Sequence, residues 1–436
     1  MAEQDTIFAL SSGRLPAGVA VVRLSGARVR FVIETMFGRI PGPREMAYGS
    51  FRGLTGDVID HGLVVFFAGP SSFTGEDCGE FHVHGSVAVV REMCKQLAGL
   101  EHVRHAEPGE FTQRAFLNRK LDLTQAEGLG DLIAAETEAQ RKLALMQAAG
   151  GLRDLYDDWR RRLVYSRAMV EAAIDFSDED DVSERSSGDV QSTLTELGAE
   201  IRRHLGGYRQ SEIIREGFRV VILGAPNSGK STLLNAFAGR EVAITTDEPG
   251  TTRDLIDVRL DLGGNLVIVT DTAGIRDNAG TVEAVGIERA RQRAAEADLI
   301  LVVEDLTGPV SISVCAVGVP VLMVGNKADK FEHPVFGYDF VVSALDGQGV
   351  SELLEGLGAW ASRCSNSTQL FAVHDRQRAL LASALDNIEA ATRAGYSLDI
   401  VAEHLRLGSD LVGRLTGRVD VEELLGVIFS KFCIGK

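Results

Sequence analysis

The segment from Gly224 to Ser231 reads G-A-P-N-S-G-K-S, a glycine-rich loop that ends in a lysine and a hydroxyl. An apolar run over 218–223 precedes the loop, and a helix-like run follows from Thr232. Glycines let such a loop wrap closely around phosphates, and the N-terminus of the following helix adds a favourable dipole. We therefore expect Lys230 to reach the β- and γ-phosphates of a nucleotide and Ser231 to bind Mg²⁺. The residues expected to contact the nucleotide here are Asn227, Ser228, Gly229, Lys230, Ser231 and Thr232.

A second motif, D-x-x-G, begins at Asp271 directly after an apolar run and ends at Gly274. An aspartate at the end of a strand can hold the Mg²⁺ shell, and a glycine N–H can contact the γ-phosphate. D-x-x-G alone is a weak signal, but at this distance behind a phosphate loop it is strong. It adds Asp271, Thr272, Ala273 and Gly274 to the expected nucleotide contacts.

A third motif selects the base. An apolar run over 319–324 leads into Asn326-Lys327-Ala-Asp329, which has the form N-K-x-D. A carboxylate accepts two hydrogen bonds from the N1–H and exocyclic amine of guanine, and an unpaired buried carboxylate would penalise adenine. The segment Ser343-Ala344-Leu345 fits a loop that backs the base, with leucine where a lysine is usual, so contact there must use backbone N–H groups. Three motifs in this order predict a GTP-binding, doubly wound α/β domain.

The group that orients the attacking water must be unusual in this chain. Ile275 follows Gly274, where Ras-like GTPases carry a glutamine, and Glu283 is the polar group available nearby. The Thr/Gly-rich loop over 241–254 places Thr252 to complete the Mg²⁺ shell. For Arg253 we favour a structural or substrate-facing role over that of an arginine finger. The same loop contributes Thr246, Asp247, Thr251 and Thr252 to the expected GTP contacts.

Composition limits the classes of protein that fit. The chain has 436 residues, which predicts two or three domains, and no apolar run approaches the ~18–20 residues of a membrane span. Its five cysteines are scattered without C-x-x-C spacing, which favours reduced thiols in a cytosol over a zinc site. The net charge of −17 means that any nucleic-acid role needs a local basic patch or a partner that binds the nucleic acid.

The flanks of the nucleotide domain differ from it. Residues 1–118 are rich in glycine-bounded β-like runs and predict a small α+β domain. Ala/Glu/Leu/Arg-rich segments with helical periodicity cover 119–215 and return over 367–436. We therefore expect a multidomain α/β plus all-α chain, in which a discontinuous helical domain is interrupted by a Ras-like P-loop GTPase domain over 216–366.

The whole chain resembles the bacterial tRNA-modification GTPases of the MnmE (TrmE) family, among the TrmE-Era-EngA-like GTPases. The resemblance covers essentially the full length, and a terminal F-C-I-G-K joined to an N-K-A-D GTPase is highly specific. It is carried by 72–77 (S-F-T-G-E-D), 108–111 (P-G-E-F), 114–118 (R-A-F-L-N), 171–176 (E-A-A-I-D-F), 250–254 (G-T-T-R-D) and 432–436 (F-C-I-G-K).

The resemblance implies an activity and its partners. In this family an N-terminal domain binds a tetrahydrofolate derivative (5-formyl- or methylene-tetrahydrofolate) and drives homodimerisation. The GTPase domains approach each other in a K⁺-dependent manner. With an FAD-dependent partner, MnmG (GidA), in a heterotetramer, the family modifies C5 of the wobble uridine (position 34) of certain tRNAs in the cytoplasm.

Site residues carry over only where this sequence matches the family. The folate-contacting positions are Arg23, Glu80, Lys120 and Lys436. The K⁺ site takes the Asn227 side chain and the backbone carbonyls of Thr246, Glu248 and Thr251, and the Mg²⁺ site takes Ser231 and Thr252. Glu283 matches the water-orienting glutamate and acts with Lys230 in catalysis.

Cys433 has three interpretations. The resemblance raises a one-carbon role for its thiol, C-I-G-K fits a prenylation box badly, and a buried apolar cysteine is the more frequent case. Two rival functions stay open at this point. One is a regulatory or ribosome-assembly GTPase switch without folate chemistry, which would be expected to carry a basic RNA-binding appendage. The other treats 1–118 as a purely structural dimerisation module.

Overall fold

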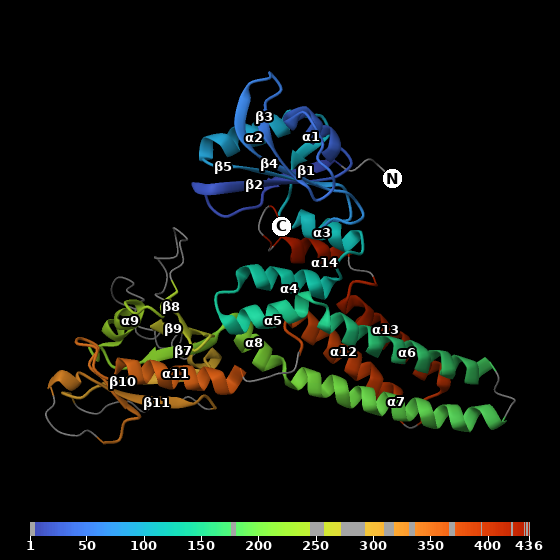
Figure 1. Ribbon diagram of the computed structural model, residues 1–436. Helices are drawn as coiled ribbons and strands as arrows, with labels where there is room; N and C mark the ends of the chain where they lie inside the picture. Colours follow the sequence, from blue (N-terminus) through green and yellow to red (C-terminus); the bar gives the residue numbers. More distant parts are fainter. Residues whose placement is uncertain are drawn as a thin grey trace, which may run out of the picture. The chain divides into compact units, whose positions relative to one another are not determined.

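The computed structural model groups the chain into two compact units, which are considered separately (Figure 1). The first unit comprises Met1–Gly130, Arg153–Arg161 and Ser409–Lys436, and the second comprises Asp131–Leu152 and Arg162–Gly408. Each unit contains a six-stranded sheet. The structure describes residues 5–175, 180–244, 257–271, 293–308, 318–330, 336–365, 371–393, 395–419 and 422–430, together with 432 and 435.

The sheet of the first unit is antiparallel except where β1 pairs with β6, and its order is β3-β4-β5-β2-β1-β6. Helices α1 (Val29–Phe37) and α2 (Val87–Ala98) cover one face, where Ile33 and Met93 join the same core as Phe81 (Figure 1). The strands are β1 Thr6–Leu10, β2 Ala17–Ser25, β3 Met46–Arg52, β4 Val58–Phe67, β5 Cys78–Gly85 and β6 Val103–His105.

Side chains alternate between the two faces of this sheet, as the period of a strand requires. In β5, Phe81 and Val83 are buried in the core, whereas Glu80 and His82 are only partly buried and point to the other face. Arg23 of β2 is the register partner of Glu80. A charged pair therefore lies in mid-strand, on the face that the helices leave uncovered.

The sheet of the second unit has the order β12-β11-β10-β7-β9-β8 and is parallel except for the β8–β9 hairpin. Strand β10 is apolar and almost wholly buried, as expected for a parallel strand that is covered on both faces. Helices α9 and α11 share one core with the sheet, and Ala294 and Ala297 pack against the other face. The elements are β7 Phe218–Leu223, α9 Lys230–Ala238, β8 Asp257–Leu262, β9 Asn265–Asp271, β10 Leu299–Asp305, β11 Val321–Asn326, β12 Phe340–Val341 and α11 Val350–Ser365.

Helices precede and follow this sheet in the sequence, as expected. They are α3 Glu110–Leu117, α4 Leu123–Ala134, α5 Glu138–Ala148, α6 Gly151–Asp175, α7 Asp180–Gly206, α8 Tyr208–Glu216, α12 Asp375–Ala391, α13 Leu398–Leu415 and α14 Glu422–Phe429. Within the second unit α7 lies along α12, where Arg202 forms an ion pair of 2.5 Å with Glu389 (Figure 1). The predicted fold class, mixed α/β with a helical part, is confirmed. The domain boundaries at 118, 215 and 366 stay predictions.

In the described part of the chain, no helix is both long enough and apolar enough to cross a bilayer.

Candidate functional site

The loop between β7 and α9 has a backbone that needs its glycines. Asn227 and Gly229 have φ values of 66° and 91°, in the left-handed region. A Cβ on Gly224 would lie 2.4 Å from the carbonyl oxygen of Val303, and one on Gly229 would lie 2.2 Å from Asn326 Nδ2. Side chains at these two glycines would therefore push the loop off its neighbours. The close packing leaves the loop directly before the N-terminus of α9, where an anion is favoured.

The Lys230 side chain folds over this loop. Its Nζ donates hydrogen bonds to the carbonyl oxygens of Gly224 (2.9 Å) and Ala225 (2.8 Å). Burial lowers the pKa of Lys230, and the nearby Asp271 carboxylate opposes that shift. The ammonium group is thus held at the loop where the sequence predicts phosphates. Its N–H groups can donate hydrogen bonds to phosphate oxygens.

Ser231 and Asp271 meet at the end of β9. The Ser231 hydroxyl donates to Asp271 Oδ2 over 2.8 Å, and Asp271 is 2% exposed. A hydroxyl and a carboxylate are oxygen ligands of the kind that Mg²⁺ takes beside nucleotide phosphates. The structure therefore brings together two of the residues that the sequence predicts near the metal, and their donor atoms suit that ion.

Asn326 links the phosphate loop to the predicted base loop. Its Nδ2 donates to the Ser228 carbonyl oxygen (2.9 Å), and its Oδ1 accepts from the backbone N–H of Ala344 (3.0 Å). Asp329 Oδ1 accepts from the Ser343 hydroxyl over 2.8 Å, which fixes the orientation of the carboxylate. Leu345 is 81% exposed. The phosphate loop, the N-K-x-D segment and the 343–345 loop are therefore neighbours in the fold.

Asp305 is a charged member of this region to which the sequence assigned no role. Lys327 Nζ lies 2.5 Å from Asp305 Oδ2, and the Thr307 hydroxyl and N–H also donate to this carboxylate. These contacts lower the pKa of Asp305 to about 2. A usable signal was present: Asp305 ends the strand next to the one that leads into Lys327, and parallel strands end at one edge.

Several predicted site residues lie outside the described residues. They include the water-orienting candidate and most of the predicted metal and nucleotide contacts from two loops. These residues are Thr246, Asp247, Glu248, Thr251, Thr252, Thr272, Ala273, Gly274, Glu283, Cys433 and Lys436.

A second charged site lies on the uncovered face of the first sheet. Arg23 donates to Glu80 Oε1 from Nε (3.2 Å) and from its terminal nitrogen (3.1 Å), and His82 Nε2 lies 3.3 Å from Glu80 Oε2. The hydrogen bond with His82, aided by the charge of Arg23, holds the pKa of Glu80 below its ordinary value despite partial burial. Glu80 is therefore an ionised acceptor flanked by donors.

Lys120 and Arg23 converge on one loop of this unit. Lys120 Nζ donates to the Pro70 carbonyl oxygen (3.0 Å), and the Arg23 guanidinium lies 5.6 Å from the centre of the Phe73 ring. Lys120 and Phe73 line a cavity of about 450 Å³. Cations beside an aromatic ring and a carboxylate suit a planar ligand that carries both amide-like edges and carboxylates.

The C-terminal segment also reaches the first sheet. The Ser11 hydroxyl, just beyond the end of β1, donates to the carbonyl oxygen of Gly435 over 2.6 Å. A Cβ on Gly435 would lie 2.3 Å from the Leu10 carbonyl oxygen, so the close approach requires glycine at this position. Gly435 is therefore fixed beside the strand that pairs with β2.

Comparison with known proteins gives matches over the full chain. Residues 6–120 match a family described as "GTP-binding protein TrmE N-terminus", and residues 123–433 match "MnmE helical domain". The tRNA modification GTPase MnmE of Brucella anthropi is 52% identical over 436 residues, covering 99% of this chain and 98% of that protein. The Brucella canis protein of the same name is 52% identical over 435 residues, with the same coverage. Among solved structures, the G domain of the T. maritima FeoB iron transporter covers 33% of this chain and 98% of its own, at 20% identity and a TM-score of 0.25.

Proposed function

The chain belongs to the family of the tRNA modification GTPase MnmE, and on that premise we propose that its GTPase is activated by K⁺. We propose further that, with an FAD-dependent partner, it modifies C5 of the wobble uridine of certain tRNAs by using a tetrahydrofolate one-carbon unit. The GTPase activity and its place in tRNA modification follow from the family. The cation, the partner and the one-carbon donor are the proposal.

The arrangement of the phosphate loop is the observation that carries the hydrolytic part. Lys230 and the Ser231–Asp271 pair lie beside one loop, and Asn326 ties that loop to the predicted base-binding segment. In the proposal Lys230 binds the β- and γ-phosphates and Ser231 binds Mg²⁺ together with Thr252. Glu283 orients the attacking water, because Ile275 has no group that could do so.

The K⁺ site is proposed beside the same loop. Asn227 is exposed and has a positive φ, so its amide can reach a cation at the edge of the phosphates. The backbone carbonyls of Thr246, Glu248 and Thr251 would complete the ligand set. When bound, K⁺ would supply the positive charge that an arginine finger gives in other GTPases.

The folate site is proposed on the first unit. Glu80 offers a carboxylate to the amide-like edge of a pterin, while Arg23, Lys120 and Lys436 offer cations to glutamyl carboxylates. The hydrogen bonds that join Arg23 to Glu80 and Lys120 to the 70–73 loop support this assignment. A homodimer, assembled with the flavin-dependent partner into a heterotetramer in the cytoplasm, completes the proposal.

The experiment compares steady-state GTPase rates in KCl and NaCl at equal ionic strength. The wild type is expected to be accelerated strongly and selectively by K⁺. Asn227→Gly should remove that acceleration, because it deletes the amide without straining a residue whose φ is 66°. Asn235→Gly, an exposed position of α9, is the matched control. Equal rates of the wild type in the two salts would overturn the K⁺ proposal and favour an ordinary switch GTPase.

A further inference from the structure

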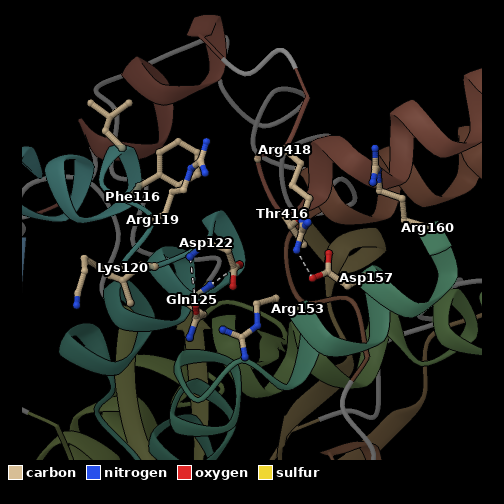
Figure 2. A pocket seen from close by; sticks show the side chains of 13 residues that line it. Phe116, Arg119, Lys120, Asp122, Gln125, Arg153, Asp157, Arg160, Thr416 and Arg418 are labelled. Atoms are coloured by element: carbon tan, nitrogen blue, oxygen red, sulfur yellow. Dashed lines mark hydrogen bonds and ion pairs between the residues drawn. The ribbon is translucent and has the colours of Figure 1, made fainter. Parts of the chain in front are cut away.

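A basic cleft of about 810 Å³ lies within the first unit (Figure 2). It is named here for the five cationic residues that line it: Arg119 and Lys120 after α3, Arg153 and Arg160 of α6, and Arg418 after α13. Figure 2 shows that these side chains come from three separate segments of the chain, with the end of Lys120 turned away from the arginines. Apart from Lys120, none of these residues belongs to the proposed nucleotide or folate site.

The cleft has an excess of positive charge in a strongly acidic protein. Its lining includes two carboxylates, Asp122 and Asp157. Asp157 is paired with Arg418 at 2.5 Å, and Arg153 pairs with Asp154, outside the lining, at 3.0 Å. Asp122 Oδ1 accepts hydrogen bonds from the backbone N–H groups of Thr124 and Gln125 at the start of α4. The whole chain has a net charge of −17. Because such a chain repels polyanions, a local concentration of cations is the feature that nucleic-acid binding would require.

The helix α6 presents its part of the cleft on one face. Arg153, Asp157 and Arg160 stand at i, i+4 and i+7, which share one side of a helix. Arg160 Nε is buried and has no hydrogen-bond partner in the described part of the chain. A guanidinium is a planar fork of donors that matches the oxygens of a phosphate. Arg160 therefore keeps donor capacity beside a cavity large enough for a ligand.

Arg119 contributes from the opposite side of the cavity. It is exposed and has a φ of 58°, an uncommon value for a residue other than glycine. Arg119 stands directly after α3, beside Lys120, whose ammonium group already donates to the Pro70 carbonyl oxygen, so Arg119 supplies the available cation of this wall. The cations are thus distributed along the cleft rather than clustered at one point, which suits successive charges on a backbone better than one small anion.

We propose that the basic cleft binds backbone phosphates of tRNA. This inference rests on the proposed function, in which tRNA is the molecule modified, and it assigns a surface of this chain to that RNA. The contacts are to phosphates, so binding there is independent of base sequence and depends strongly on salt.

The test measures equilibrium binding of tRNA to the full-length chain over a series of NaCl concentrations, without nucleotide. The variants are Arg153→Gln, Arg160→Gln and the double variant. Arg91→Gln, which changes an exposed arginine of α2 outside the cleft, is the matched control. Each cleft substitution is expected to weaken binding about tenfold. Each should also reduce the slope of log affinity against log salt by about one, while the GTPase rate without tRNA stays unchanged.

Arg119→Gln protects the test against a folding defect, because its side chain is exposed. Unchanged tRNA affinity and salt slope in both the double variant and Arg119→Gln would overturn the proposal. A wild type that fails to bind tRNA would also overturn it. So would binding of inorganic phosphate at the cleft if the substitutions leave the affinity for tRNA unchanged. The K⁺ dependence of GTP hydrolysis is measured separately, so failure at the cleft is distinguishable from failure of the proposed function.

Discussion

The two sheets of this chain assemble their charged groups in different ways. In the second unit the polar residues stand where parallel strands end: Asp271 ends β9, Asp305 ends β10 and Asn326 ends β11. In the first unit the charged pair stands in the middle of two antiparallel strands, where Arg23 and Glu80 are register partners. The first arrangement builds a site from loops and backbone groups at one edge, and the second builds it from side chains on one face.

The two sites therefore depend on different interactions. At the strand ends, close backbone contacts at Gly224 and Gly229 and the two hydrogen bonds of Asn326 hold several segments together. On the antiparallel face, one carboxylate organises its neighbours through hydrogen bonds with Arg23 and His82. We therefore expect substitutions at the strand ends to affect nucleotide chemistry and local stability together. Substitutions on the antiparallel face should affect the binding of a single ligand and the pH dependence of stability.

The largest effect is expected for Lys230→Ala. Removing the ammonium group takes away a charge held at the phosphate loop, and a loss of roughly 10²–10³-fold in kcat/KM for GTP is expected. Steady-state hydrolysis measures it. Lys330→Ala, at an exposed lysine of the same unit, is the control and should stay near the wild-type value. Hydrolysis by Lys230→Ala at the wild-type rate would show that the nucleotide site does not depend on this ammonium group.

Asn326→Ala should have the next largest effect. It removes two buried hydrogen bonds and leaves the Ser228 carbonyl and the Ala344 N–H without this partner. A decrease of about 2–4 kcal/mol in the unfolding free energy is expected, with a raised KM for GTP. Denaturant unfolding and GTP kinetics measure the two quantities. If Asn326→Ala unfolds like the wild type, the linkage between the phosphate and base loops contributes nothing to stability.

Glu80→Gln is expected to change how the stability of the protein depends on pH. The folded-state pKa of Glu80 is lowered, so between the folded and unfolded pKa values the unfolded state binds more protons and stability rises with pH. This contribution is present above the ordinary value of about 4.3 and is lost as pH falls through the folded pKa. The difference in unfolding free energy between wild type and Glu80→Gln should therefore shrink below that pH. Glu101→Gln, at an exposed position, should show no such trend.

The smallest effect is expected for Asp305→Asn. Its ion pair with Lys327 is partly open to solvent, since both side chains are about a quarter exposed. Such pairs contribute less than about 1 kcal/mol. Denaturant unfolding at neutral pH should therefore show a change within that limit. A loss as large as that of Asn326→Ala would mean that charge, rather than the Asn326 hydrogen bonds, holds the strand ends together.

The same contrast explains which site residues could be predicted from the sequence. The phosphate loop, Asp271 and the N-K-x-D segment are short contiguous motifs at strand ends. Their spacing in the sequence was therefore enough to predict the sheet and the closeness of these motifs at its edge. Arg23 and Glu80 lie far apart in the sequence, and only the register of β2 against β5 brings them together. No local sequence pattern encodes that register. The resemblance to a family supplied them. Their ligand roles, like those of Glu283 and Thr252, stay predictions.

The basic cleft could not be predicted from the sequence, for a related reason. Its cations come from segments after α3, in α6 and after α13, and packing alone brings these together. The i, i+4, i+7 pattern of Arg153, Asp157 and Arg160 was visible, but charge on one face of a helix usually indicates a solvated surface. The expectation that nucleic-acid binding needs a local basic patch now has a candidate in this cleft.

We propose that one chain carries two separate ligand sites, one for GTP on the second unit and one for a folate on the first. The most direct test measures equilibrium binding of a non-hydrolysable GTP analogue and of 5-formyl-tetrahydrofolate to wild type, Lys230→Ala and Glu80→Gln. Lys230→Ala should lose affinity for the nucleotide alone, and Glu80→Gln should lose affinity for the folate alone. A wild type that does not bind the folate, or a single substitution that abolishes binding of both ligands, would contradict the claim.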